Sequence, residues 1–367
     1  MTFTSRKAAL VGLATIGVSA LVLTGCAAAP TEEEPGGETT DFLSCMVSDS
    51  GGFDDHSFNE LGLAGLESAA KEIGGKTNSV ESASEDDFAP NIEAQIGEGC
   101  NLIVTVGFLL SAATNEAAAA NTDVEFAIVD DGLDADGDGA PDVENGKPIL
   151  FDTAQAAFLA GYAAASYSKT GVVGTFGGIP IPPVTIFMDG FVDGVAYYNE
   201  VKGTDVQAVG WDKAGQTGTF TGGFAAGVEA KTAAQGLLDQ NADVILPVGG
   251  PIYQSAAEAI RDKGGDIALI GVDADVYNTD PTVADLLLTS IQKGVDAGVH
   301  DVVVAASSGD FDNTPYVGTL ENGGVGLAPF HDFESKVDPA LQGELDELKA
   351  AIISGEVEVS SPATPGQ

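Results

Sequence analysis

Basic residues are scarce in this sequence. Its 367 residues include 14 lysines and arginines against 56 aspartates and glutamates, which gives a formal net charge of −42 at pH 7. A surface of this charge repels the phosphate backbone, so nucleic-acid binding is excluded as a function. The charge does not by itself indicate a cationic ligand, because surface charge mainly affects solubility and non-specific association.

Histidines are also few, and this limits the enzyme chemistry that the chain could perform. A Ser-His-Asp triad has only three histidines to draw on, and neither a Gly-x-Ser-x-Gly elbow nor a Walker phosphate loop is present. Ser290-x-x-Lys293 and Lys169-Thr170-Gly171 match two elements of penicillin-recognising serine enzymes, but their order is reversed and no Ser-Asp-Asn element lies between them. We therefore expect a binding protein and not an enzyme. The histidines are His56, His300 and His331.

Only one apolar run is long enough to concern a membrane. Ala8 to Val22 carries no charge, but its 15 residues fall short of the roughly 20 that a spanning helix needs. It follows Arg6 and Lys7, which is the pattern of a secretory signal peptide. Leu23-Thr24-Gly25-Cys26 comes next and resembles the lipobox of bacterial lipoproteins, in which the cysteine is lipidated and becomes the first residue of the mature chain.

We therefore expect residues 1–25 to be a lipoprotein signal peptide, and Cys26 to anchor the mature chain at the extracytoplasmic face of the cell membrane. Residues 26–40, rich in Pro, Gly, Glu and Thr, cannot bury an apolar face and indicate a flexible tether. Loss of Arg6 and Lys7 with the signal takes the formal net charge from −42 to −44.

Two further cysteines open two apolar runs. Cys45 precedes Met46-Val47, and Cys100 precedes the run 102–106. If the runs are neighbouring parallel strands, both thiols lie at the same end of the sheet and can form a disulfide outside the cytoplasm. The alternative is two separate buried thiols. A thiol nucleophile is not expected, because no histidine lies near either cysteine in the sequence.

The body of the chain alternates short strand-like runs with longer helical ones. Runs such as Val244-Ile245-Leu246 are continuously apolar, which is typical of parallel strands covered on both faces. The repeated β–α pattern predicts an α/β protein of two doubly wound parallel-sheet lobes, one before about residue 151 and one after it. Strands are expected at 42–47, 102–106, 124–129, 171–176, 206–209, 243–248 and 267–272. Helices are expected at 61–73, 111–120, 153–168, 190–199, 223–239 and 254–263.

Glycine and aspartate gather directly after these strands. In open α/β sheets the carboxyl edge of the strands is where ligands bind, so these residues predict a ligand cleft between the lobes. The six strand ends carry Asp49-Ser50-Gly51-Gly52, Gly107-Phe108, Asp130-Asp131, Gly177-Gly178, Gly249-Gly250 and Asp273-Ala274-Asp275.

Several segments, in order along nearly the whole mature chain, resemble the basic membrane protein family, the purine-nucleoside-receptor-like lipoproteins that serve ABC importers. The segment 47–60, with its Asp pair followed by Ser57-Phe58-Asn59, is fairly specific to that family. The remaining segments are weak singly but form an ordered set. They are Phe158–Ala164, Lys169–Gly171, Phe187–Phe191, Ala242–Ile245, Ile270–Asp273 and Thr289–Lys293.

The resemblance implies a type I periplasmic-binding-protein fold that holds a purine nucleoside in its cleft. Phe58 and Phe220 match the aromatics that sandwich the base from the two lobes, and a flat heterocycle stacks on any aromatic face. Asp49 and Asn59 match the residues that read the base edge. The remaining matches are Asp130, as a further cleft contact, and Asp273 and Lys293, which hold the ribose hydroxyls.

The same resemblance implies lobes formed by residues 41–151 with 289–312 and by 152–288 with 313–358. It also implies an ABC permease as partner, and we expect the protein to be a monomer. Closure of a hinge around the ligand, followed by docking on the permease, is the expected mechanism.

Some residues have a second interpretation. Phe58 could be a core residue of the helix that follows it, Lys293 a solvated lysine, and Asp55 and His56 caps of that helix. Gly222 stands where the family often has an acidic residue, Val276 stands where it usually has Gln, and Trp211 could replace or join the aromatic stack. The ligand could then be a pyrimidine or modified nucleoside or a free base. A sugar-binding or signal-sensing protein of the same fold is the alternative function.

One acidic loop resembles the first half of a calcium-binding loop. Asp134, Asp136 and Asp138 alternate and Gly139 occupies the sixth position, but the twelfth position is Asn145 where a bidentate Glu is needed. Asp142 or Glu144 could replace it. We expect no cofactor, and favour an acidic surface loop over a structural Ca²⁺ site.

Overall fold

The computed structural model describes residues 40–366. The predicted signal peptide, the lipidated Cys26 and almost all of the predicted tether lie outside the described residues. Within the described range, no helix combines the length and the apolar character that a membrane span requires.

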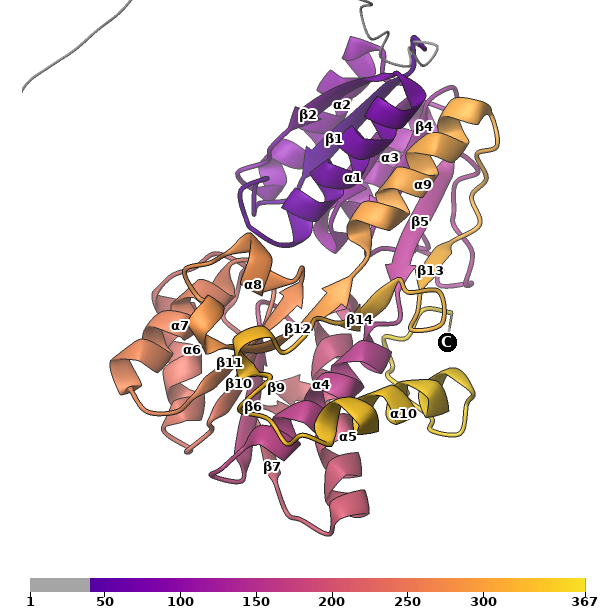
Figure 1. Cartoon of the computed structure of the whole chain (residues 1–367). Helices are drawn as coiled ribbons and strands as arrows, with labels where there is room; N and C mark the ends of the chain where they lie inside the picture. Colours follow the sequence, from indigo (N-terminus) through magenta and orange to yellow (C-terminus); the bar gives the residue numbers. More distant parts are fainter. Residues whose placement is uncertain (1–39, 367) are drawn as a thin grey trace, which may run out of the picture. The chain divides into compact units, whose positions relative to one another are not determined.

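The first sheet has six parallel strands in the order β13-β5-β4-β3-β1-β2. Helices α1 and α9 pack on one face of this sheet and α2 and α3 on the other, which explains why its central strands are buried and continuously apolar (Figure 1). The strands are β1 (Leu43–Ser48), β2 (Lys76–Val80), β3 (Leu102–Val106), β4 (Glu125–Val129), β5 (Gly146–Phe151) and β13 (Tyr316–Gly318). The helices are α1 (Phe58–Ile73), α2 (Phe88–Glu98), α3 (Ser111–Ala120) and α9 (Val295–Ser308).

The second sheet has the order β14-β12-β11-β10-β6-β7 and is parallel except for β14, which pairs antiparallel with β12. Helices α4 and α5 cover one face, with α10 packed on α4, and α6 and α7 cover the other. The strands are β6 (Val172–Gly177), β7 (Gln207–Val209), β10 (Val244–Val248), β11 (Ala268–Asp273), β12 (Leu287–Lys293) and β14 (Val325–Leu327). The helices are α4 (Thr153–Tyr167), α5 (Pro182–Lys202), α6 (Val228–Leu238), α7 (Ile252–Lys263), α8 (Val276–Thr279) and α10 (Leu341–Ile353), and β8 (Trp211–Asp212) and β9 (Thr217–Gly218) form a small hairpin.

The close packing of α4 on α5 explains glycines in and near two of the sequence runs that carry the family resemblance. A Cβ atom on Gly161 would lie 2.0 Å from the carbonyl oxygen of Phe191, and one on Gly194 would lie 2.0 Å from that of Phe158. Only glycine allows the two helix backbones to approach so closely at these points. Gly161 belongs to the run 158–164 and Phe191 to the run 187–191, so packing alone accounts for part of the family resemblance.

The predicted α/β fold with two doubly wound sheets is confirmed. Every predicted strand and helix is present, and most of their ends agree within a few residues. The exceptions are α5, which begins eight residues before its predicted start, and α6, which begins five residues after its predicted start. Strand pairing differs from the expected lobe boundaries in two places. Residues 289–312 were assigned to the first lobe, but β12, which overlaps the start of that range, pairs with β11 in the second sheet. Residues 313–358 were assigned to the second lobe, but β13 within that range extends the first sheet beside β5.

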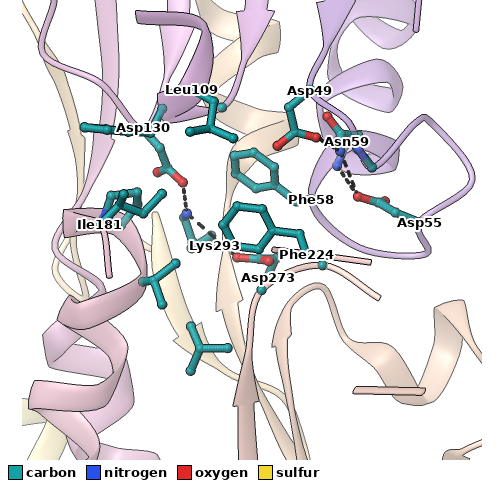
Figure 2. Close-up of a pocket in the computed structure, with 18 of the residues that line it drawn as sticks. Asp49, Asp55, Phe58, Asn59, Leu109, Asp130, Ile181, Phe224, Asp273 and Lys293 are labelled. Atoms are coloured by element: carbon teal, nitrogen blue, oxygen red, sulfur yellow. Dashed lines mark hydrogen bonds and ion pairs between the residues drawn. The ribbon is translucent and has the colours of Figure 1, made fainter. Parts of the chain in front are cut away.

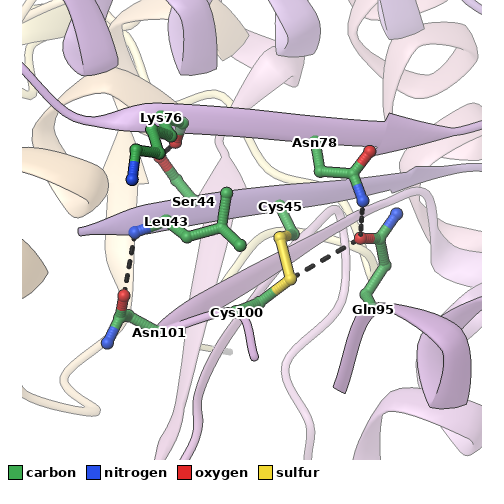
Figure 3. Close-up of a disulfide and its surroundings, with 8 residues drawn as sticks. All are labelled: Leu43, Ser44, Cys45, Lys76, Asn78, Gln95, Cys100 and Asn101. Atoms are coloured by element: carbon green, nitrogen blue, oxygen red, sulfur yellow. Dashed lines mark hydrogen bonds between the residues drawn. A yellow bond between two sulfur atoms is a disulfide. The ribbon is translucent and has the colours of Figure 1, made fainter. Parts of the chain in front are cut away.

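Cys45 and Cys100 are joined by a disulfide, with Cα atoms 5.9 Å apart (Figure 3). Cys45 lies on β1, and Cys100 lies just before β3, the parallel neighbour of β1. Both side chains are buried in the core between the first sheet and α2. Beside them, Asn78 Nδ2 donates a 2.9 Å hydrogen bond to Gln95 Oε1. The bridge therefore ties β1 to the start of β3 at the amino end of the strands, away from the predicted cleft edge.

Candidate functional site

One cavity lies where the carboxyl ends of the strands of both sheets meet, with a volume of about 60 Å³ (Figure 2). Small-molecule pockets occupy roughly 300–1,000 Å³, so a small organic ligand enters this cavity only when the two lobes move apart. We call it the cleft. Six of the seven predicted ligand-binding residues line it, namely Asp49, Phe58, Asn59, Asp130, Asp273 and Lys293.

The strand ends position the charged residues. Asp49 follows β1 and Asp130 follows β4, while Asp273 and Lys293 are the last residues of β11 and β12. Asp130 and Asp273 adopt left-handed backbone conformations, with φ of +69° and +67°. Such strain in residues other than glycine concentrates at functional sites, where it aims a side chain that a regular strand would direct elsewhere.

At one end of the cleft, Asn59 lies between two carboxylates. Its Nδ2 donates to Asp49 Oδ1 at 2.9 Å and to Asp55 Oδ2 at 3.1 Å (Figure 2). Asp55 also accepts the backbone N–H groups of Ser57, Asn59 and Glu60, so it caps the start of α1 as one interpretation of the sequence predicted. With the amide nitrogen fixed in this way, Asn59 Oδ1 is buried and has no hydrogen-bond partner. A buried acceptor gains free energy from a donor, so this atom is available to accept a hydrogen bond from a bound molecule.

At the other end, a buried ammonium group lies among carboxylates and aromatic rings. Lys293 Nζ is 2.5 Å from Asp130 Oδ2 and 3.8 Å from Asp273 Oδ1, and the Lys293 side chain is 2% exposed. The same nitrogen lies 4.8 Å from the ring centroid of Phe58 and 5.7 Å from that of Phe187, which are cation–π distances. Lys293 is therefore a buried residue of the cleft and not a solvated lysine.

Burial raises the pKa of three cleft carboxyls. Desolvation raises the pKa of Asp49 and of Asp130, in the second case against the opposing effect of Lys293. Desolvation raises the pKa of Asp273 to about 6, which Lys293 opposes and Asp130 reinforces. The cleft thus holds more carboxyl groups than its single ammonium neutralises, and each carboxyl gains from a ligand that donates hydrogen bonds.

The second aromatic of the cleft is not the predicted one. Phe220 lies outside the cleft, where its ring packs edge-on against Trp211 at 5.9 Å between centroids. Phe224 lines the cleft instead, near Phe58 (Figure 2). A Cβ atom on Gly178 or Gly249 would come within 2.6 Å of the Phe224 ring, so these two glycines make room for it.

Trp211 does not join a stack in the cleft. It is buried, and its Nε1 donates a 2.8 Å hydrogen bond to the buried carboxylate of Asp189 on α5. That carboxylate also accepts from Gln216 and Ser361. Trp211 therefore stabilises the second lobe and does not line the cleft.

Further apolar residues complete the cleft, and no periodic pattern in the sequence predicts them. They lie at the end of β10, in the 3₁₀ turn after β3, and in or just before the first two turns of α5, so no single sequence repeat relates them. Only the Gly249-Gly250 and Gly107-Phe108 strand ends pointed to this region. These residues are Phe108, Leu109, Ile181, Pro183, Val184, Phe187 and Val248.

Two other sequence motifs lie elsewhere or are arranged differently from their prototypes. Asp134, Asp136 and Asp138 bring carboxylate oxygens within 4.8 Å of one another in an exposed loop. Asp134 already accepts three backbone N–H groups of that loop, so its carboxylate shapes the turn.

Ser290 and Lys293 are three apart on a strand, which directs them to opposite faces, and Ser290 Oγ accepts the N–H of Val276. They do not form the serine–lysine pair of the penicillin-recognising enzymes.

Comparison with known proteins agrees with this geometry. A family model described as ABC transporter substrate-binding protein PnrA-like matches residues 42–362. The chain is 29% identical to the CD4+ T-cell-stimulating antigen of Listeria innocua, over 96% of this chain and 98% of that protein. It is 28% identical to the ABC transporter nucleoside-binding protein BmpA of Lactococcus lactis, over 94% and 96%. Among solved structures, an ABC transporter solute-binding protein of Aeropyrum pernix is 25% identical with a TM-score of 0.76, covering 88% of this chain and 94% of that one.

Two doubly wound sheets with a cleft at their carboxyl ends define the type I solute-binding proteins of ABC transporters. Within that class, the chain belongs to the PnrA-like family of ABC transporter substrate-binding proteins, also known as basic membrane proteins. The predicted family resemblance is confirmed. The family consists of binding components of transporters and not of enzymes.

Proposed function

We propose that this protein is an extracytoplasmic lipoprotein that captures a purine nucleoside in the cleft and delivers it to an ABC import permease. The observation that carries the proposal is the pairing of an unsatisfied buried acceptor, Asn59 Oδ1, with a carboxylate, Asp49, beside the ring of Phe58. A heterocycle with N–H groups on its edge and a flat face satisfies both features at once.

The base lies between Phe58 and Phe224 in this proposal. One ring comes from the start of α1 in the first lobe and the other from the loop before α6 in the second. Stacking on an aromatic side chain stabilises a bound base by roughly 1–3 kcal/mol. The Asp49–Asn59 pair then accepts hydrogen bonds from the base edge, because the amide nitrogen of Asn59 is already committed to two carboxylates.

The sugar lies at the opposite end of the cleft, against Asp273, Lys293 and Asp130. A carboxylate accepts hydrogen bonds from two vicinal hydroxyls, and an ammonium group donates to their oxygens. Lys293 directs one of its three hydrogens to Asp130, which leaves two for a ligand. Ionised Asp273 gains from hydroxyl donors because it is buried and the ammonium, at 3.8 Å, is too far away to form a hydrogen bond with it.

Closure of the two lobes around the ligand is supported by hydrogen bonds that connect them directly. Ser57 Oγ donates to the carbonyl of Val272 at 3.0 Å, and Thr279 Oγ1 donates to the carbonyl of His56 at 2.7 Å. His56 and Ser57 precede α1 of the first lobe, and the other two residues flank Asp273 in the second. These bonds fit a hinge-type closure that buries the ligand.

The lipid anchor at Cys26, the monomeric state and the permease complete the proposal. They rest on the lipobox resemblance and on the role of the family in ABC transport. The anchor keeps the captured nucleoside close to the membrane, and the tether 26–40 lets the binding lobes reach a permease there.

A thermal-shift screen tests the ligand class. The soluble chain beginning after Cys26 is heated with adenosine, guanosine, inosine, cytidine, adenine and ribose. A ligand at 100 times its Kd stabilises the folded state by about 2.7 kcal/mol, which shifts Tm by several degrees for a protein of this size. Shifts with purine nucleosides but not with ribose support the proposal, and shifts with sugars alone overturn it.

A double variant, Asp49→Ala with Asn59→Ala, separates base recognition from sugar binding. It removes both groups at the base end and leaves Asp273 and Lys293 in place. Nucleoside binding should be lost if these groups read the base. An unchanged affinity for every nucleoside would show that they only support α1.

A further inference from the structure

A second cavity adjoins the cleft at its sugar end, with a volume of about 170 Å³. We call it the side compartment. Three residues line both cavities, Phe108, Asp130 and Pro183, so the side compartment begins where the Lys293–Asp130 pair ends the cleft. A substituent on the sugar end of a bound molecule would point toward it.

The outer wall of the side compartment is the C-terminal segment of the chain. Ala363 and Pro365 contribute to that wall, opposite Asp131 of the first lobe. The segment is held in place by Ser361, a buried residue whose Oγ donates a 2.6 Å hydrogen bond to Asp189 on α5. A turn then closes on itself, since Ala363 N donates to Ser361 Oγ and Thr364 N donates to Ser361 O.

The chemistry of the side compartment is apolar and acidic. Its charged residues are Asp130 and Asp131, and none of the described residues that line it is basic. Asp131 Oδ1 accepts from Ser111 and from the backbone of Leu133, which fixes the carboxylate in position. The remaining lining is supplied by proline, phenylalanine, leucine and isoleucine side chains together with small residues.

We propose that the side compartment receives a 5′ substituent of the bound nucleoside, and that it admits uncharged or cationic groups such as an alkylthio group and excludes phosphate. This rests on the proposed function, which puts the sugar at Asp130 and Asp273. A phosphate in the side compartment would bring negative charge close to the carboxylates of Asp130 and Asp131. The nearby cation, Lys293, is already paired with Asp130, so the repulsion is not offset. An alkylthio group instead contacts the apolar lining.

Isothermal titration with two ligand series tests the proposal on the chain that begins after Cys26. The first series is adenosine, 5′-deoxy-5′-methylthioadenosine and adenosine 5′-monophosphate, and the second is the same set built on inosine. In the series whose parent binds, the methylthio derivative should bind within about threefold of the parent, because it fills apolar space. The monophosphate should bind at least about 100-fold more weakly.

Two variants locate the effect in the side compartment. Ala363→Trp fills the space from the C-terminal wall, so the methylthio derivative should lose about tenfold in affinity while the parent nucleoside changes little. Ala363→Leu is a smaller replacement that serves the same purpose if the tryptophan prevents folding. Asp131→Asn keeps an acceptor for Ser111 and Leu133 but removes a charge, so monophosphate binding should improve at least about threefold.

The outcomes distinguish this inference from the function on which it rests. Binding of a parent nucleoside with strong rejection of its methylthio derivative would overturn the inference alone. So would an Ala363→Trp variant that weakens parent and derivative equally. Failure of adenosine, inosine and guanosine alike to bind would overturn the proposed function, and the inference with it.

Discussion

Lys293 Nζ lies 2.5 Å from Asp130 Oδ2, and this ion pair joins the two sheets. Lys293 ends β12 of the second sheet, and Asp130 follows β4 of the first. Both side chains are almost fully buried, with 2% and 9% exposure. Burying such a pair costs desolvation free energy, so it contributes little net stability. Its position in the cleft therefore indicates a role in ligand binding.

Lys293→Met should lower both stability and ligand affinity. The variant leaves Asp130 and Asp273 buried without their cation, and breaking a buried pair in this way costs roughly 3–5 kcal/mol. Urea unfolding at pH 7 measures the loss. Lys263→Met is the matched control, because Lys263 forms an exposed pair with Asp239 and should leave the unfolding midpoint nearly unchanged. Equal effects of the two variants would contradict the assignment of Lys293 to the cleft.

Phe58→Ala and Phe224→Ala should each weaken nucleoside binding about 5- to 150-fold, from the loss of roughly 1–3 kcal/mol of stacking. Phe220→Ala is the control, since Phe220 packs on Trp211 outside the cleft. It should reduce stability and leave affinity almost unchanged. Titration calorimetry with the best nucleoside gives the three affinities. A larger loss of affinity in the Phe220 variant than in the Phe224 variant would restore the family-based assignment.

Asp273 should make the ligand-free protein less stable as pH rises from about 4 to about 6. Its pKa is raised to about 6 in the folded state from an ordinary 3.8, so within this window the folded state binds the extra proton. The free energy of unfolding should therefore fall by up to about 3 kcal/mol across the window through this group. Below the window both states are protonated and the contribution of this group to stability is fully present.

The Asp273→Asn variant isolates that contribution. Lys293, Asp130, Asp55 and Ser57 all face or influence the Asp273 carboxyl, so the wild-type pH profile contains other groups as well. The difference in unfolding free energy between variant and wild type removes them to first order. Relative to wild type, the unfolding free energy of the variant should increase as the pH rises from 4 to 6.5. A difference independent of pH would show that Asp273 titrates normally.

The fold was largely predictable because buried parallel strands are continuous apolar runs. β3 and β10 follow directly from that pattern. β2, with the sequence Lys-Thr-Asn-Ser-Val, was not predicted, because an edge strand with mostly exposed side chains carries no such pattern. β12 was also not predicted, since it mixes Leu288 and Ile291 with the polar residues of the Thr289–Lys293 segment.

The polar end of the site was predictable and the aromatic end only in part. Asp49, Asp130 and Asp273 stand at strand ends, where the topology of parallel sheets gathers side chains at one edge. Phe220 and Phe224 instead lie in a glycine-rich loop, where sequence spacing does not determine side-chain direction. Gly178 and Gly249, which are distant in sequence from this loop, leave space for the Phe224 ring, whereas the Phe220 ring lies against Gly177.

Removing the Cys45–Cys100 disulfide should lower stability without affecting ligand binding. The two cysteines are 55 residues apart, and a loop of that length predicts about 4 kcal/mol of stabilisation through the unfolded state. The bridge is at the amino end of β1 and β3, whereas the cleft is at the carboxyl end. The Cys45→Ala, Cys100→Ala double variant should unfold at lower urea concentration and keep its affinity within about twofold. A large loss of affinity at a temperature where the variant is folded would indicate coupling along β1.

Thr279→Val should speed ligand release although Thr279 does not line the cleft. Its hydroxyl donates to the carbonyl of His56 and thereby connects the second lobe to the first. A net hydrogen bond contributes about 1 kcal/mol, so loss of this one should destabilise the closed form and raise the dissociation rate about fivefold. Thr232→Val is the matched control, because the hydroxyl of Thr232 donates to a carbonyl within α6 and connects no lobes.

Stopped-flow measurement of nucleoside release separates the two variants. If the bond between His56 and Thr279 holds the closed form, release accelerates in the Thr279 variant only, while the urea midpoints of the two variants remain similar. Equal release rates in both variants would mean that this bond forms in the open protein too. The closed form would then depend on the ligand and on the bond from Ser57 to Val272.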